Sequence, residues 1–204
     1  MRIQTKMTAV FSGVIALLML VAAMFGYYFF KQYLTEKIEE KMATSVIEQA
    51  KILDSNLLSK QKLLEISWYN LNQVMKNGQI SADLLAGYKQ ADPELTDMYF
   101  GSVTGRFVDG SGWKPPADYD PRQRPWYKEA IEAGKITITA PYFDLVEKQM
   151  ALSIAMPVRN EAGEIYGVVA TDLPLARLLD KMKWADMYEG SYGYLLNESG
   201  TVLA

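Results

Sequence analysis

One uncharged stretch near the start of the chain limits its possible folds more than any other feature. From Met7 to Phe30 the sequence contains no Asp, Glu, Lys or Arg. This length exceeds the ~20 apolar residues that a helix needs to cross a hydrocarbon core of ~30 Å. A cleaved signal peptide is the alternative, with Val21 and Ala23 as small residues of a cleavage site. The continuation GYYFF, which begins at Gly26, favours a retained transmembrane helix because it prolongs the apolar run and adds aromatic residues typical of a membrane interface.

Positive charges on the two sides of this span are nearly balanced. Arg2, Lys6 and the terminal amine precede it, and Lys31, Lys37 and Lys41 follow it. The distribution of basic residues therefore does not decide the orientation of the span. A six-residue tail leaves no room for a domain, so we expect the folded part to follow the membrane.

The composition excludes several kinds of chemistry. Cysteine and histidine are both absent from the 204 residues, which removes disulfides, thiolate or imidazole metal ligands and the usual general base of a nucleophilic triad. The formal net charge of -3 comes from interspersed signs, without a cluster of Lys and Arg that could neutralise a phosphate backbone. We therefore expect no metal, no cofactor and no nucleic-acid partner.

A long amphipathic pattern follows the span. Apolar residues recur at steps of mostly three or four, which is the stripe of a single α-helix. We expect this helix to occupy residues 31–78 and to end at Asn77 and Gly78. It would leave the membrane as a stalk and end as a packing surface, and the same stripe also fits a homodimer formed through the long helix. The stripe consists of Leu34, Ile38, Met42, Val46, Ala50, Leu53, Leu57, Leu64, Trp68, Leu71 and Met75.

Beyond residue 78 the periodicity changes from that of a helix to that of strands. Consecutive strands with one helical insertion, after a long helix, indicate an α+β domain whose antiparallel sheet rests on the stalk helix. A connecting helix and the start of a further strand-turn-strand follow. The predicted elements are a helix at Ser81–Gln90, strands at Met98–Phe100 and Arg106–Val108, a helix at Pro125–Ala133, strands at Thr137–Asp144, Met150–Val158 and Ile165–Asp172, a helix at Leu173–Met182, and a strand-turn-strand at Gly190–Ala204.

Seven residues of this α+β domain are candidates for a binding site. Each also has a structural interpretation, for example Arg124 as a surface cation, Trp126 as a packing residue and Asp172 as a helix cap. As a set they supply what a zwitterion needs. The candidates are Tyr119, Arg124, Trp126, Tyr127, Tyr142, Asp144 and Asp172.

The chemistry of these residue types explains that interpretation. Arg124 offers a planar fork for a carboxylate, to which the indole NH of Trp126 can add a donor. Asp144 and Asp172 offer acceptors for an ammonium group. Tyr142 lies two residues before Asp144 on a predicted strand, so both side chains share one face of the sheet. Opposite charges at opposite ends of one small cavity select a molecule that carries both.

Four runs of sequence give the chain a family resemblance. They are Tyr119 to Tyr127 (YDPRQRPWY), Pro141 to Asp144 (PYFD), Ala155 to Val158 (AMPV) and Gly167 to Asp172 (GVVATD). With these runs the chain resembles, over essentially its whole length, the extracytoplasmic double Cache domain (dCache_1) of bacterial chemoreceptors and sensor kinases. A large group within that family binds amino acids through a pattern of the form Tyr-x4-Arg-x-Trp-Tyr, Tyr-x-Asp and a later Asp, which this sequence matches at every position.

The resemblance implies a role for each candidate residue. In one place the chain departs from the family, because members often carry Thr-Gly in the turn after the PYFD run, where this chain has Glu147 and Lys148. That departure leaves the geometry of the turn open. By resemblance, Arg124 and Trp126 hold the ligand carboxylate, Tyr142, Asp144 and Asp172 hold its amino group, and Tyr119 and Tyr127 complete the pocket.

The resemblance also implies an organisation for the whole chain. The sensor domain would lie outside the bacterial cytoplasmic membrane, in a chemotaxis receptor that recognises an amino acid and signals to cytoplasmic partners through regions beyond this chain. The expected parts are a cytoplasmic tail at 1–6, a transmembrane helix at 7–30, a stalk helix at 31–78, a membrane-distal Cache module with a PAS-like antiparallel sheet at 79–184, and the start of a membrane-proximal module at 185–204.

Other functions remain open at this point. The same module could serve a sensor kinase or a nucleotide cyclase, or bind an amine, a small carboxylate or a purine. An enzyme would have to use Asp144 and Asp172 as an acid/base pair, without histidine, cysteine or a metal cluster. A purely structural anchor would explain the helix but would leave the seven candidate residues without a role.

Overall fold

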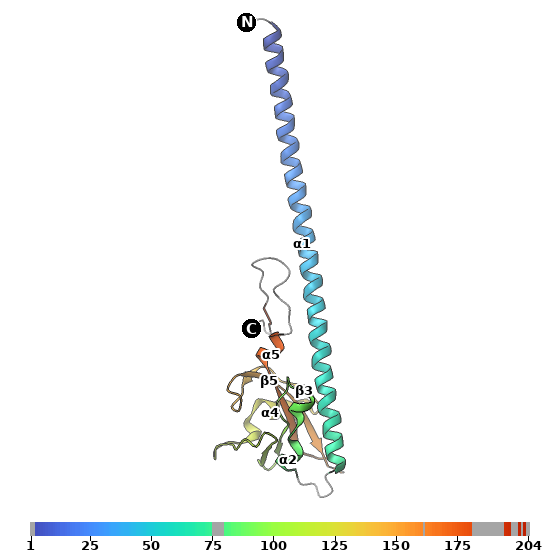
Figure 1. The fold of residues 1–204 in the computed structure, drawn as a ribbon, viewed down its shortest axis with the longest axis vertical. Coiled ribbons are helices and arrows are strands. Elements are labelled where there is room, and N and C mark those ends of the chain that lie inside the picture. Colours follow the sequence, from blue (N-terminus) through green and yellow to red (C-terminus); the bar gives the residue numbers. More distant parts are fainter. Residues whose placement is uncertain are drawn as a thin grey trace. The chain divides into compact units, whose positions relative to one another are not determined.

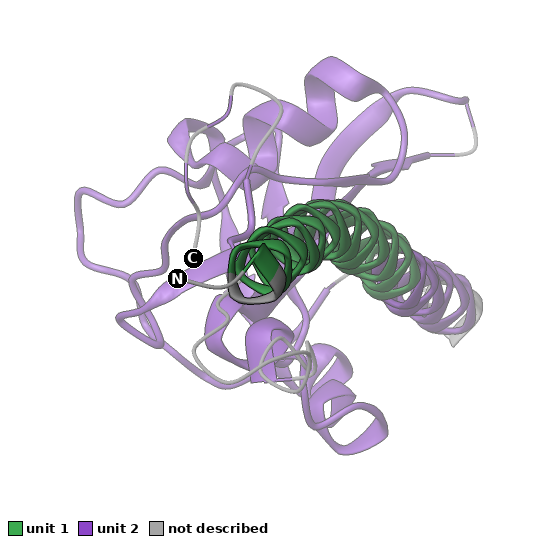
Figure 2. Cartoon of the chain, turned by 90° about the horizontal axis from the view of Figure 1, so that it is seen from above, with its two compact units in different colours: residues 1–50 green, residues 51–204 purple. Residues whose placement is uncertain are grey.

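The structure of this chain is a computed structural model that describes residues 3–74, 80–160, 162–180, 194–196, 200 and 202. By the density of its internal contacts the chain divides into two compact units, residues 1–50 and residues 51–204 (Figure 2). The first unit consists of helix alone in its described part, and the second contains the sheet.

Helix α1 occupies Ile3–Val74 and includes the predicted membrane span and most of the predicted stalk (Figure 1). In the described part of the chain it is the one helix long and apolar enough to cross a membrane. Its large apolar side chains are exposed, with Phe11 at 67% and Leu18 at 62%, as suits a surface solvated by lipid. The predicted stop at Asn77 and Gly78 lies outside the described residues, as does Met75 of the stripe.

The sheet confirms the predicted α+β class. Its order is β2-β1-β6-β5-β3, with β4 also paired to β5, and every pairing is antiparallel. The two central strands, β5 and β6, are each ten residues long and pair along almost their whole length. The strands are β1 at Tyr99–Ser102, β2 at Phe107–Asp109, β3 at Thr137–Ile138, β4 at Tyr142–Phe143, β5 at Met150–Arg159 and β6 at Ile165–Pro174.

Helix α4 forms where the sequence predicts it, at Pro125–Ala133. Pro125 occupies the first turn, where its missing N–H costs no hydrogen bond, and Gly134 ends the helix at a φ of 63°. A short 3-10 helix, η1 at Pro121–Gln123, comes directly before it and was not predicted. Asp120 caps η1 by accepting a hydrogen bond from the backbone N–H of Arg122 at 2.9 Å.

Most strand ends differ from the prediction by one or two residues, and three predicted elements differ in a way that has a structural reason. The predicted helix at Ser81–Gln90 is two helices, α2 at Ala82–Leu85 and α3 at Tyr88–Ala91, because Gly87 between them adopts a φ of 84°. The predicted strand at Thr137–Asp144 is also two, β3 and β4, which pair with different parts of β5. The connecting helix, α5 at Leu175–Asp180, begins two residues late because β6 continues through Pro174, and its predicted end at Met182 lies outside the described residues.

Large apolar side chains cover the sheet face that meets α1. Leu64 and Trp68 of α1 are buried there, and the Trp68 ring stacks on that of Phe100 with centroids 6.4 Å apart and planes within 4°. This core joins the second half of α1 to the sheet, as the stripe predicts. Its buried residues from the strands and from the position just before β1 are Met98, Phe100, Leu152, Ile154, Val158, Val169 and Leu173.

The opposite face carries smaller and more polar side chains, because neighbouring strand residues point to opposite faces. It includes Tyr99, Ala155 and Ala170, which pack with Trp126 and Ala130 of α4. Most of the predicted second module, residues 185–204, lies outside the described residues. Within it, Leu196 and Val202 form an isolated antiparallel bridge.

Candidate functional site

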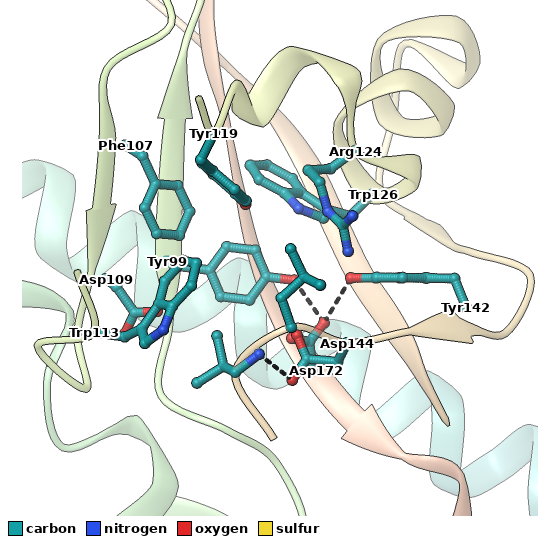
Figure 3. A pocket seen from close by; sticks show the side chains of 12 residues that line it. Tyr99, Phe107, Asp109, Trp113, Tyr119, Arg124, Trp126, Tyr142, Asp144 and Asp172 are labelled. Atoms are coloured by element: carbon teal, nitrogen blue, oxygen red, sulfur yellow. Dashed lines mark hydrogen bonds between the residues drawn. The ribbon is translucent and has the colours of Figure 1, made fainter. Parts of the chain in front are cut away.

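A small cavity opens on the α4 side of the sheet (Figure 3). The centre of a water molecule can reach about 20 Å³ of it, which is room for roughly one or two waters. Even the smallest amino acid is larger than one or two water molecules, so the cavity would have to widen to admit a ligand. The lining residues are Tyr99, Phe107, Asp109, Trp113, Tyr119, Arg124, Trp126, Tyr142, Asp144, Leu145, Val146 and Asp172.

Asp172 lies at the polar centre of the cavity. It is 4% exposed, and its Oδ1 accepts hydrogen bonds from the hydroxyls of Tyr99 at 2.6 Å and Tyr142 at 3.3 Å. Ser153 donates a third at 2.5 Å, because the register of β5 and β6 places it directly opposite Asp172. No hydrogen bond from the described residues reaches Oδ2, so one carboxylate oxygen remains for a ligand.

Burial governs the charge of this carboxyl. It raises the pKa of Asp172 to about 7, and the neighbouring Asp144 adds to the increase, while the hydroxyls of Ser153, Tyr99 and Tyr142 oppose it by bonding the charged form. Burial also raises the pKa of Tyr99 well above its usual value, so its hydroxyl stays protonated and continues to donate. Asp172 therefore changes charge near neutral pH.

Asp144 contributes the second buried carboxylate, at 5% exposure. It follows β4 and accepts backbone N–H bonds from Val146 at 3.1 Å and Glu147 at 2.5 Å, both on Oδ2. These bonds shape the turn that carries Leu145 and Val146 along one wall of the cavity. Lys148 completes the turn at a φ of 53°, a left-handed conformation that favours glycine. The departure from the family pattern is thus accommodated in the turn without displacing Asp144 from the cavity.

Arg124 stands at the other end of the cavity (Figure 3). The residue links η1 to α4 with an extended backbone, at φ -78° and ψ 147°. Its Nη2 donates to the carbonyl of Phe143 at 3.2 Å, and its Cζ lies 5.4 Å from the centroid of the Tyr142 ring. Within the described part of the chain no ion pair joins this guanidinium to Asp144 or Asp172, so most of its donors are available to an anion.

Trp126 and Tyr119 form an aromatic wall beside Arg124. Trp126 is 2% exposed and its ring lies on Gly101 of β1, where an added Cβ would come within 2.7 Å of the indole. A glycine at 101 therefore permits α4 to approach the sheet. Burial raises the pKa of Tyr119 to about 12, against the opposing effects of the Arg124 charge and the Trp126 indole. Tyr119 is consequently a neutral hydroxyl at physiological pH.

The structure brings six of the seven predicted residues together around the cavity. Tyr127 is the exception and corrects the prediction that it walls the pocket. It is 7% exposed and packs in the apolar cluster of α4 and the sheet, with its ring edge toward Gly101. One residue along a helix turns the side chain by roughly 100°, so Trp126 faces the cavity and Tyr127 does not line it.

Sequence reasoning missed several residues that line the cavity or hold its lining residues in place. Tyr99 and Ser153 belong with Asp172 only through the strand register, which a single sequence does not reveal. Asp109 and Trp113 lie at the end of β2 and in the loop after it. Their signal was the clustering of aromatic and acidic residues ahead of the YDPRQRPWY run. The described residues contain no cluster of His, Cys, Asp and Glu that could hold a metal.

Comparisons with known proteins show what this chain is similar to in sequence and in fold. The family model dCache_1, described as a Cache domain, matches residues 11–204. The methyl-accepting chemotaxis protein McpG of Pseudomonas putida is 26% identical over 203 residues, which is 100% of this chain and 31% of that protein. The chain thus spans about a third of the length of that relative.

Two solved structures are similar in fold. The ligand-binding domain of the Pseudomonas aeruginosa chemoreceptor PctB, in complex with L-Arg, has a TM-score of 0.60 and 29% identity, covering 74% of this chain and 63% of that one. The ligand-binding domain of Mlp24 with asparagine has a TM-score of 0.67 and 26% identity, covering 82% of this chain and 71% of that one. Both are ligand-binding domains that were solved with an amino acid.

Proposed function

This chain belongs to the Cache domain family, whose model matches 194 of its residues (11–204), and from that premise we propose that its α+β module binds a free amino acid. One observation carries the proposal. The Arg124 guanidinium and three buried carboxylates, those of Asp109, Asp144 and Asp172, line one cavity, and no ion pair among the described residues joins the guanidinium to them. Such an arrangement complements a zwitterion, because each end of the ligand finds the opposite charge.

The roles of the residues follow from their positions. Arg124 takes the ligand carboxylate, and the indole NH of Trp126 is the second donor. Asp172 and Asp144 take the ammonium group through the oxygens that no described residue bonds, and Tyr142 steadies Asp172. Hydroxyls already hold one oxygen of Asp172, so its orientation is set before the ligand arrives, which lowers the entropic cost of binding.

The cavity must widen for this ligand to enter. Leu145 and Val146 line it and are 39% and 36% exposed, so they separate it from solvent. Outward movement of this turn would admit the ligand, and closure over it would give the bound state a different arrangement from the empty one. Differential affinity for the two arrangements is what allows a ligand to signal.

We further propose the organisation of the chain as a membrane receptor fragment. Residues 1–6 would be the cytoplasmic tail, 7–30 the membrane span, 31–78 the stalk, 79–184 the ligand-binding module outside the bacterial inner membrane, and 185–204 the start of a second module. The exposed apolar surface of α1 supports the span. Homodimerisation through α1 and chemotactic output through regions beyond this chain are part of the proposal. A sensor kinase or a cyclase is the alternative output.

Calorimetric titration of the chain in detergent with each of the twenty amino acids tests the ligand class. We expect saturable binding of at least one of them, abolished by Arg124→Ala. Arg122→Ala is the matched control, since Arg122 lies two residues away, is exposed and pairs with Asp120 outside the cavity. Absence of heat from every amino acid, or equal loss in both variants, would refute the assignment.

Three further outcomes separate the competing functions. Binding of an amine without a carboxylate, unaffected by Arg124→Ala, would favour an amine sensor. If a carboxylate or a purine binds and its affinity survives Asp172→Asn, the site does not recognise an ammonium group. Chemical conversion of the bound ligand, followed by mass spectrometry, would identify an enzyme that uses Asp144 and Asp172 as acid and base.

A further inference from the structure

A second hollow adjoins the candidate site on the far side of Tyr99. It shares Tyr99, Asp109, Val146 and Asp172 with the first cavity, and the centre of a water molecule can reach about 40 Å³ of it. The two hollows are thus neighbours with a common wall at the carboxylate that is proposed to hold the ammonium, and together they make up the space around that carboxylate. Asp109 lines both hollows, so it is within the same lining as Arg124 and Asp172, where a ligand would be held.

Asp109 occupies the end of this space away from Arg124. Figure 3 shows the two residues on opposite sides of the Tyr99 ring, with Trp113 beside Asp109. Asp109 is 6% exposed, and its Oδ1 accepts both the backbone N–H and the hydroxyl of Ser111 at 2.6 Å. Oδ2 accepts no hydrogen bond from any described residue. One oxygen of a buried carboxylate thus remains free to accept a hydrogen bond from a ligand in this space.

Aromatic rings line the space from the Asp109 end toward Arg124. Phe107, Trp113 and Tyr119 pack edge to face, with centroids 5.0 to 5.9 Å apart, and all three line the cavity together with Asp109. Aromatic faces attract cations and provide no partner for an anion. A carboxylate within an aromatic wall therefore recognises an ammonium or a guanidinium better than a neutral amide.

The other charged groups that line the second hollow also favour a cationic ligand. Asp97 and Glu147 line it along with Asp109, against the single ammonium of Lys89, which is exposed. Desolvation raises the pKa of Asp109, and repulsion from Asp97 and Asp144 adds to this increase. A positive charge delivered by the ligand would relieve that repulsion, whereas a neutral side chain would leave it in place.

We propose that Asp109 and the Phe107/Trp113 wall select a cationic side chain, so that the ligand is a basic amino acid with an ammonium or guanidinium at its end. This inference rests on the proposed amino-acid function and adds the class of side chain to it. Asp109 binds the terminal cation through Oδ2, at the opposite end of the cavity from the carboxylate that Arg124 holds.

Matched ligand pairs test the proposal on the full chain in detergent. L-citrulline has nearly the shape of L-arginine without its charge, and L-norleucine lacks the ammonium of L-lysine. We expect the cationic member of at least one pair to bind about tenfold to a hundredfold more tightly, as one charge-assisted hydrogen bond implies. Equal affinities within both pairs would overturn the proposal, while failure of every amino acid to bind would instead refute the proposed function.

Two variants locate the selectivity. Asp109→Asn should bring the ratio within a pair close to one, because it removes the charge that distinguishes the cationic ligand from its neutral analogue. Asp118→Asn, an exposed acid on the same loop, is the control and should keep the full ratio. Trp113→Leu should reduce the ratio without abolishing binding, and it serves if Asp109→Asn does not fold. An unchanged ratio in both Asp109→Asn and Trp113→Leu would assign the selectivity to other residues and overturn the role given to Asp109.

Discussion

The two faces of the central sheet are built from the same strands but have opposite characters. On β6 the alternation places Val169 and Leu173 on the α1 face and Ala170 and Asp172 on the cavity face. The α1 face is filled by large apolar side chains. The cavity face has small residues, a buried carboxylate and hydroxyls, and it leaves a hollow. Stability is thus concentrated on one face and recognition on the other.

This division has a physical reason. Large apolar side chains contribute most by excluding water, at roughly 25 cal/mol per Å² buried, and this needs close packing without voids. A binding site needs the reverse, an unfilled volume with polar groups left partly unsatisfied. Because strand residues alternate in direction, one sheet can meet both needs with a period of two.

The largest expected effect concerns the α1 face. Leu64 is fully buried between α1 and the sheet, so Leu64→Ala should lower the free energy of unfolding by about 2–5 kcal/mol. Leu58 on the same helix is 55% exposed, and Leu58→Ala should change the free energy of unfolding by no more than about 0.5 kcal/mol. Urea denaturation followed by tryptophan fluorescence measures both. Equal effects would contradict the packing of α1 on the sheet.

The next prediction concerns pH and the cavity face. The folded protein holds the Asp172 proton up to pH about 7, whereas the unfolded chain releases it near pH ~4. The unfolding free energy should therefore fall as pH rises through this window, by up to about 4 kcal/mol from this group, and level off above pH about 7. Asp172→Asn should lack that part of the pH dependence. Identical slopes for wild type and variant between pH 4 and 7 would contradict the elevated pKa.

Ligand affinity should show the opposite dependence on pH. An ammonium group pairs with the ionised form of Asp172, so amino-acid affinity should rise with pH up to about 7 and then level off. Titrations at pH 7 in buffers of different ionisation enthalpy should detect proton release on binding, because the ligand's charge favours ionisation of the carboxyl. Proton uptake, or affinity that falls between pH 5 and 7, would contradict the pairing.

A buried ion pair ties α1 to the segment before β1. Lys60 is 3% exposed and lies 2.6 Å from Asp92 and 2.7 Å from Glu94. Because the two acids are partly exposed, Lys60→Met should cost about 1–3 kcal/mol rather than the larger penalty of a fully buried pair. Lys62→Met is the matched control, since Lys62 pairs with Glu65 in solvent and should cost less than about 0.5 kcal/mol.

A thermal shift of each variant measures this difference between a buried and an exposed lysine. The segment that holds Lys60 leads directly to the binding site, because Thr96 accepts a hydrogen bond from the backbone N–H of Asp172 at 2.8 Å on its hydroxyl. Equal shifts for Lys60→Met and Lys62→Met would show that the buried pair contributes no more than a surface one.

The sequence predicts the elements whose ends are determined locally. Helix α4 has the predicted bounds, because Pro125 favours its start and Gly134 its end through their own backbone preferences. The long helix follows from an apolar stripe that no single residue interrupts. Six of the seven candidate residues line one cavity because the family pattern already encodes their arrangement in space.

The remaining features depend on contacts between distant segments. The predicted strand at Thr137–Asp144 is divided into β3 and β4 because its two ends pair with different parts of β5. The sequence of this short segment gives no information about that pairing. Tyr99 and Ser153 reach Asp172 through a register that is set by the whole sheet. Trp126 and Tyr127 both lie against Gly101 of β1, a contact between distant segments that the sequence of α4 alone does not reveal.

The smallest expected effect separates two tyrosines that the sequence pattern treats alike. The Tyr142 hydroxyl contacts Ser153 at 2.6 Å and Asp172 at 3.3 Å, so Tyr142→Phe removes one bond from the carboxylate that is proposed to hold the ammonium. We expect amino-acid affinity to fall by about threefold to tenfold, the value of a single hydrogen bond. Tyr127→Phe should change it by less than about twofold, because Tyr127 does not line the cavity. Calorimetric titration of both variants measures this difference. A larger loss of affinity from Tyr127→Phe than from Tyr142→Phe would show that Tyr127 belongs to the binding site.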